Sequence, residues 1–197
     1  MPHPPRPASA TAPFRLPAMA LLVLTLGGCM PLPIPSDEIS LRTYRDTLCQ
    51  VDLGYPEGWT FTEKTSYSLE GKVHDLQFEP MRTEWTRRFA VKVVAPDRPL
   101  ATRTLSHLKG EILERLRRAQ PPPRLDDTTA AVLGGEPAFV VHYTTFMNGQ
   151  PFVRHEDIVC HRGGRDVALS FEVAADHAGA DIVLFRKIAD RFRFDPP

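Results

Sequence analysis

Residues 138–173 have the sequence AFVVHYTTFMNGQPFVRHEDIVCHRGGRDVALSFEV. Two dipeptides, Asn148-Gly149 and Gly163-Gly164, divide this stretch into three segments of similar length. Such dipeptides are typical of the two-residue turns that join antiparallel strands, because these turns need residues that tolerate a positive φ. Apolar and polar residues tend to alternate within the segments, as they do in strands with one buried face. The stretch therefore predicts a three-stranded antiparallel meander.

The flanking sequence supplies further strands and two helices. Short apolar runs predict strands near residues 48–53, 59–61, 76–78, 89–93 and 128–133. Apolar residues at three- and four-residue spacing predict a helix that begins after Thr104; they are Leu105, Leu108, Ile112 and Leu116. Similar spacing predicts a last helix over 181–192. We therefore predict the α+β class, with an antiparallel meander packed against two main helices.

The first 28 residues have the three regions of an export signal. Arg6 and Arg15 are their only charged residues, an apolar run covers 16–26, and two glycines follow. The apolar run is shorter than the roughly 20 residues that a helix needs to cross a bilayer. We therefore predict a cleaved signal peptide over 1–28.

The four residues Leu26-Gly27-Gly28-Cys29 resemble the lipobox of bacterial lipoproteins. The resemblance implies cleavage before Cys29 and lipid on its sulfur and on the new amino terminus, and two or more acyl chains hold a protein stably at a membrane. Met30 follows the cysteine, which in two-membrane bacteria resembles the pattern of lipoproteins sent to the outer membrane, facing the periplasm. The alternative is an ordinary signal peptide or a core helix with a chance cysteine.

The remaining chain is predicted to be a tether and one globular domain. Residues 29–42 contain the lipidated cysteine and a run in which proline alternates with apolar residues, which favours an extended spacer. Residues 43–197 are long enough for one domain with its own core.

Charge excludes one class of partner. The chain has 24 basic and 24 acidic residues, and removing the signal peptide takes away two arginines. A nearly neutral domain has no overall field to attract nucleic acid, so we predict no nucleic-acid partner.

Two cysteines, Cys49 and Cys160, remain besides the lipidated one. An exported chain lies in an oxidising compartment, where two remaining cysteines usually form a disulfide. We predict a Cys49–Cys160 disulfide, with two buried free thiols as the alternative.

The meander predicts one candidate metal site. Two-residue turns would place His142 opposite His155, and His155 opposite Glu172, with Asp157 on the same face. Two histidines and a glutamate are a suitable ligand set for zinc or another divalent metal. The alternative is that this row is the solvated face of the sheet. A shift of one residue in either pairing would remove the alignment.

A family resemblance covers residues 49–194. Tyr-Pro-Glu-Gly-Trp at 55–59, Leu-Gly-Gly-Glu-Pro-Ala at 133–138 and the final Phe192 and Phe194 resemble motifs of PsbP-like domains. The order of strands, helix, meander and last helix is also similar. The resemblance implies an α/β/α sandwich. It also implies a non-catalytic module that helps another protein, because such domains recur as bacterial lipoproteins, including ones similar to DcrB, and as accessory factors in photosystem assembly.

No nucleophile elbow, phosphate-binding loop, Cys-x-x-Cys or His-Glu-x-x-His motif occurs in the chain. We therefore expect a lipid-anchored cell-envelope protein that binds a protein partner, without enzymatic activity or a cofactor. The alternatives are a metal-binding protein or weak metal-dependent hydrolase that uses His142, His155 and Glu172, and a groove that holds apolar ligands.

Overall fold

The computed structural model describes residues 40–68, 71–81, 87–95 and 103–195. The predicted signal peptide, Cys29 and the tether up to residue 39 lie outside the described residues. Within the described part of the chain, no helix is long and apolar enough to cross a membrane.

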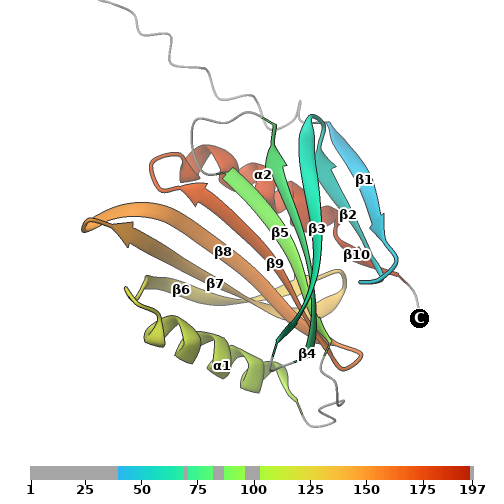
Figure 1. Cartoon of the computed structure of the whole chain (residues 1–197), viewed down its shortest axis with the longest axis horizontal. Helices are drawn as coiled ribbons and strands as arrows, with labels where there is room; N and C mark the ends of the chain where they lie inside the picture. The colour runs from blue at the N-terminus through green and yellow to red at the C-terminus, as the bar shows by residue number, and fades with distance from the viewer. Residues whose placement is uncertain (1–39, 69–70, 82–86, 96–102, 196–197) are drawn as a thin grey trace, which may run out of the picture. The chain divides into compact units, whose positions relative to one another are not determined.

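A seven-stranded antiparallel sheet forms the centre of the fold, in the order β3-β4-β5-β9-β8-β7-β6 (Figure 1). Its strands are β3 (Trp59–Ser68), β4 (Gly71–Pro80), β5 (Arg87–Ala95), β6 (Arg124–Leu133), β7 (Glu136–Met147), β8 (Gln150–Arg162) and β9 (Arg165–Ala174). The predicted meander is β7, β8 and β9, and both of its turns are present, with positive φ at Asn148, Gly149, Gly163 and Gly164. The α+β class is confirmed.

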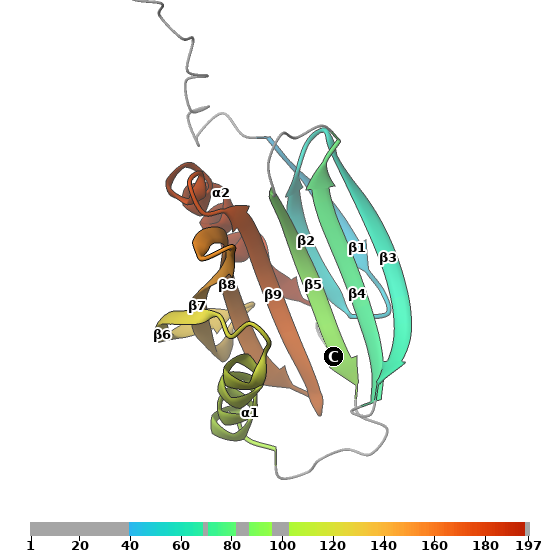
Figure 2. The same cartoon turned by 60° about the vertical axis from the view of Figure 1, so that its left-hand side comes forward.

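A second sheet has three strands, β1 (Leu41–Asp46), β2 (Val51–Pro56) and β10 (Arg193–Phe194), in the order β1-β2-β10. The strand predicted near 48–53 is β2, which begins later because residues 47–50 form the β1–β2 turn. The sequence pattern did not predict β1 and β10. β1 buries little of its surface and β10 has two residues, so neither produces an alternating pattern. Figure 2 shows the β1–β2 hairpin alongside β3 and β4.

The helices are α1 (Leu105–Arg118) and α2 (Ala178–Arg191). α1 begins after Thr104 as predicted, and Thr104 caps it, because its Oγ1 accepts a hydrogen bond from the His107 amide at 3.2 Å. α1 packs on β7 and β8, whereas α2 packs on β9 and β2. The large sheet is therefore covered on both faces, which explains why four consecutive residues of β7, 138–141, are buried.

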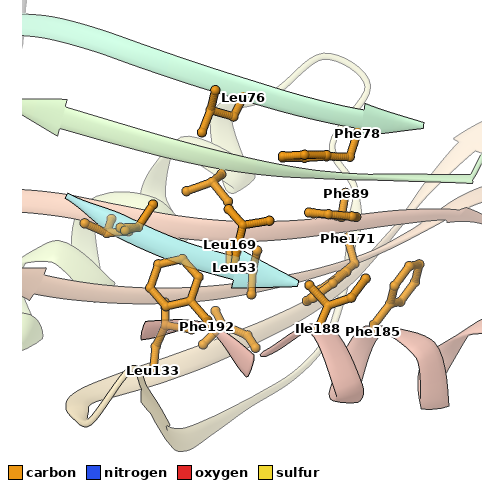
Figure 3. Close-up of a cluster of buried hydrophobic side chains, with 14 of the residues drawn as sticks. Leu53, Leu76, Phe78, Phe89, Leu133, Leu169, Phe171, Phe185, Ile188 and Phe192 are labelled. Carbon is orange, nitrogen blue, oxygen red and sulfur yellow. The ribbon is translucent and has the colours of Figure 1, made fainter. Parts of the chain in front are cut away.

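The main core lies between the large sheet, the small sheet and α2. The Phe78 and Phe89 rings stack at 4.5 Å with 7° between their planes, and Phe171 stacks on Phe185 of α2 at 4.4 Å. Figure 3 shows these rings together with Leu53 of β2. Each such fully buried side chain contributes about 1.5–3 kcal/mol by leaving water. A smaller core beneath α1 contains Leu108, Phe139, Val141 and Val159.

The turn before β7 is packed tightly against the end of the chain. Gly134 has a φ of +59°, and a Cβ there would lie 2.7 Å from Cδ2 of Phe194. Phe194 in turn contacts Phe192 edge to face at 5.1 Å, and the Arg162 guanidinium lies over its ring at 4.5 Å. The glycine therefore permits both the turn and the docking of β10.

We expect Gly134→Ala to destabilise the domain more than Gly163→Ala, although the two glycines have φ values of +59° and +57°. Each alanine should cost about 1–2 kcal/mol for the left-handed backbone. The Cβ at 134 would also overlap Phe194, which should add about 1–3 kcal/mol, whereas a Cβ at 163 meets nothing within 4 Å. Urea unfolding measures the difference, and equal free energies of unfolding would contradict this packing.

Candidate functional site

A β-bulge in the β7–β8 hairpin changes the predicted register. Next to the turn, Met147 pairs with Gln150 and Phe146 with Pro151, as a two-residue turn requires. Thr145 then pairs with Val153, so Phe152 is left as the extra residue of the bulge. Its carbonyl accepts a hydrogen bond from the Ala175 amide at 3.0 Å instead. The bulge follows Pro151, which has no N–H to donate to the ladder.

The bulge separates His142 from the other two side chains of the predicted metal site. His142 lies opposite Glu156, with its Nε2 3.3 Å from Oε2 of that residue, and not opposite His155. His155 lies opposite Tyr143, the neighbour of His142, so the two histidines project from opposite faces of the sheet. The predicted pairing of His142 with His155 is therefore wrong. The pairing of His155 with Glu172 is confirmed, with Nδ1 and Oε1 3.9 Å apart.

The residues that stay together form a polar network on the α1 side of the sheet. Nε of Arg88 donates to Glu172 Oε2 at 2.6 Å, so the carboxylate is already paired with a cation. The His155 and Tyr143 rings stack at 4.4 Å with 4° between their planes. Oγ1 of Thr145 lies 3.4 Å from His155 Nε2. His155 and Glu172 are thus held in place by other groups of the protein.

Asp157 is the carboxyl group of this network whose pKa burial raises. Burial raises its pKa to about 6, although hydrogen bonds from Ser170 and Tyr143 work against the shift. The Tyr143 hydroxyl donates to Asp157 Oδ2 at 3.2 Å. Burial also lowers the pKa of His155, with Glu172 opposing that change. Below about pH 6 the network can therefore hold a proton on Asp157, and burial disfavours a charge on His155.

A second cluster of chemically capable side chains lies where the small sheet meets the large one. Asp46 ends β1, Cys49 lies in the β1–β2 turn and His74 lies on β4, and all three are buried. One candidate ligand atom from each lies within 4.8 Å of the other two. We call these three residues the buried cluster.

Hydrogen bonds fix the orientation of each member of the buried cluster. Asp46 Oδ1 accepts from the Cys49 amide at 2.6 Å, and Asp46 Oδ2 lies 3.1 Å from His74 Nε2. The other ring nitrogen, Nδ1 of His74, lies 3.0 Å from Thr65 Oγ1 on β3. Glu63, also on β3, brings Oε1 to 3.6 Å from His74 Nε2. Carboxylate, thiol and imidazole therefore converge on one place.

The electrostatics of the buried cluster follow from these contacts. Burial acts to raise the pKa of Asp46, but the hydrogen bonds from Cys49 and His74 outweigh it and hold the pKa below its ordinary value. Burial, followed by the charge of Asp46, raises the pKa of the Cys49 thiol. Cys49 is therefore a protonated thiol beside an ionised carboxylate.

The predicted disulfide is not present, because Cys49 and Cys160 are both buried free thiols. Cys49 belongs to the buried cluster, whereas Cys160 lies on β8 between Ala138 and Val167. Burial raises the pKa of Cys160 to about 12. Thiol–disulfide exchange needs a thiolate, so neither thiol is in the reactive form at neutral pH.

The buried cluster could not be found from the sequence, because its members come from two sheets. Asp46 and Cys49 are three residues apart, but His74 joins them only through the docking of β1 on β4, and β1 was not predicted. A hollow of about 790 Å³ lies along α1, and five of its lining residues are charged: Arg103, Glu111, Glu114, Arg115 and Arg118.

Comparison with known proteins supports the fold. No family model and no curated protein matches the sequence. The structure is similar to cyanobacterial PsbP (CyanoP) from Synechocystis sp. PCC 6803, with a TM-score of 0.60 and 19% identity over 86% of this chain and 98% of that one. It is also similar to LpqN of Mycobacterium tuberculosis, with a TM-score of 0.50 and 18% identity over 81% of this chain and 92% of that one. The domain has a PsbP-like α+β fold.

We expect Asp157→Asn to stabilise the protein above pH 6 and to have little effect near pH 4. A raised pKa means that the folded state binds the proton more tightly than the unfolded state, so the contribution of Asp157 to stability falls as the pH rises from about 4 to about 6. Removing the charge should therefore increase the free energy of unfolding by about 1–3 kcal/mol at pH 7.

Urea unfolding at several pH values measures this difference. Glu79→Gln is the control, because Glu79 is exposed on β4, which β5 and β9 separate from the strand of Asp157. A difference between Asp157→Asn and the wild type that stays constant from pH 4 to pH 7 would contradict the assignment.

Proposed function

We propose that the chain is a lipid-anchored accessory protein of the bacterial cell envelope that binds a protein partner and is not an enzyme. The observation that carries the proposal is the fold, which is similar to that of LpqN, a protein involved in cell envelope biogenesis. The PsbP-like fold also fits a binding module, although a fold alone does not assign a function.

The amino-terminal sequence supports the anchor. Leu26-Gly27-Gly28-Cys29 has the residue types of a lipobox, and β1 begins at Leu41. Residues 30–40 would reach about 35 Å in extended polyproline geometry. The domain would then stay close to the membrane that carries the lipid. In a two-membrane host this would be the outer membrane, and the domain would meet its partners in the periplasm.

The surface offers features that a protein partner could use. β3 and β6 are the two edges of the seven-stranded sheet, and an edge strand can pair with a strand of another protein. Large apolar side chains are exposed on both edges, Tyr67 on β3 at 78% and Val132 on β6 at 69%. Met147, beside the β7–β8 turn, is 49% exposed.

We expect Cys29→Ser to release the protein from the membrane. Without the sulfur no acyl chain can be attached, and the lipid is the only membrane anchor in this proposal. The full chain and the variant are expressed in a two-membrane bacterium, labelled with a palmitate analogue and fractionated. Cys49→Ser is the matched control and should remain labelled. A Cys29→Ser chain that keeps both its label and its membrane association would rule out the lipid anchor.

We expect a photo-crosslinking residue at Tyr67, Val132 or Met147 to capture a specific envelope protein in the native host. The same residue at Arg118, whose side chain is 77% exposed on α1, is the control for random encounter. Mass spectrometry identifies the captured protein. If all three positions give the same pattern as Arg118, or nothing, the partner role is contradicted at these surfaces.

A further inference from the structure

The buried cluster has the composition and spacing of a metal site, and it lies away from the network that the sequence analysis had singled out. We propose that Asp46, Cys49 and His74, together with Glu63, bind one zinc ion at the junction of the two sheets. This inference does not depend on the lipid anchor or on a protein partner.

The distances are close to those that a tetrahedral zinc ion needs. Zinc bonds of about 2.0–2.3 Å place neighbouring ligand atoms about 3.3–3.6 Å apart. His74 Nε2 is already 3.1 Å from Asp46 Oδ2 and 3.6 Å from Glu63 Oε1. The ligand atoms of the three buried residues lie within 4.8 Å of one another. Movements of about 1 Å would therefore bring them to coordination distance.

The groups behind the ligands support the same interpretation. Metal-binding histidines usually donate their other ring N–H to a neighbouring group, which fixes the tautomer. Without a metal, His74 Nε2 donates to Asp46 Oδ2 and Thr65 Oγ1 donates to Nδ1. Zinc at Nε2 would take the place of that proton, and Thr65 Oγ1 would then accept from a protonated Nδ1. The Cys49 amide holds Oδ1 of Asp46 and leaves Oδ2 available.

The mixture of donor atoms selects the metal. Sulfur, imidazole nitrogen and carboxylate oxygen together suit zinc, whereas magnesium and calcium prefer oxygen alone. Zinc would bond to the Cys49 sulfur with release of the thiol proton to solvent, and Asp46 and Glu63 would bind as carboxylates. The negative charges of the Cys49 thiolate and of the two carboxylates exceed the two positive charges of the zinc ion by one. Arg165 lies beside the turn, with its Nη1 3.5 Å from the Leu48 carbonyl oxygen, and supplies a positive charge there.

The position of the cluster gives the ion a structural role. Asp46 and Cys49 belong to the β1–β2 hairpin, whereas Glu63 and His74 lie on β3 and β4 of the large sheet. The Glu63 side chain is 43% exposed, so it stands at the solvent side of the site, while the other three ligands are buried. A zinc ion there would link the two sheets and protect the small sheet from local opening.

The test is titration of the metal-free, full-length protein with cobalt(II) and then with zinc, in detergent and without a histidine tag. We expect one equivalent of cobalt to bind and to give thiolate-to-cobalt charge-transfer absorption, which zinc abolishes by displacing the cobalt. Zinc should also raise the Tm. Cys49→Ser should lose the charge-transfer absorption, whereas Cys160→Ser, which changes the other buried thiol, should keep it.

Two variants at exposed positions test the site without disturbing the core. Glu63→Gln removes the proposed fourth ligand and Thr65→Val removes the partner of His74 Nδ1; both should weaken metal binding by about 10-fold or more. Glu79→Gln, on the same large sheet, should bind as the wild type does.

Several results would overturn the proposal. A folded wild-type protein that gives no thiolate-to-cobalt absorption would do so, as would absorption that survives in Cys49→Ser or is lost in Cys160→Ser. If Cys49→Ser does not fold, the decision rests on Glu63→Gln and Thr65→Val. Wild-type affinity in both of these would reject the site.

Discussion

The contact on which the rest of the structure depends is the packing of Tyr44 of β1 on the large sheet. Its ring lies 4.8 Å from that of Phe61 on β3 and 5.7 Å from that of Phe78 on β4, and these rings continue into the stack with Phe89. This contact docks the small sheet and closes the main core over α2. Since side chains two residues apart on a strand share a face, it also places Asp46 toward the same sheet and over His74. Core packing and the buried cluster are thus two results of one docking event.

Much of the large sheet could be predicted from the sequence because local signals decide it. Asn148-Gly149 and Gly163-Gly164 specify their turns, and Thr104 caps α1 through a contact three residues away. The small sheet could not be predicted in the same way. β10 is two residues long and exists because the chain end packs against β2 and Gly134, which is a tertiary effect.

The candidate sites show where pattern reasoning fails. The predicted row of metal ligands depended on the pairing register of β7 and β8. One extra residue shifts that register, and Phe152 is the extra residue. Pro151 was the available signal, because a proline inside a strand indicates a bulge or an edge. The predicted disulfide rested on compartment and on counting cysteines, and the structure places the two thiols in different surroundings. The buried cluster needed residues from β1, from the β1–β2 turn and from β4, which spacing along the chain does not reveal.

A metal-linked junction between the two sheets would help to keep the domain folded, as the proposed tethered envelope protein requires. X-ray absorption at the zinc edge of the zinc-loaded, full-length protein tests this account most directly. The account predicts one sulfur neighbour at about 2.3 Å together with nitrogen and oxygen neighbours at about 2.0–2.2 Å. A first shell that contains nitrogen and oxygen but no sulfur would contradict it, because zinc would then be bound away from Cys49.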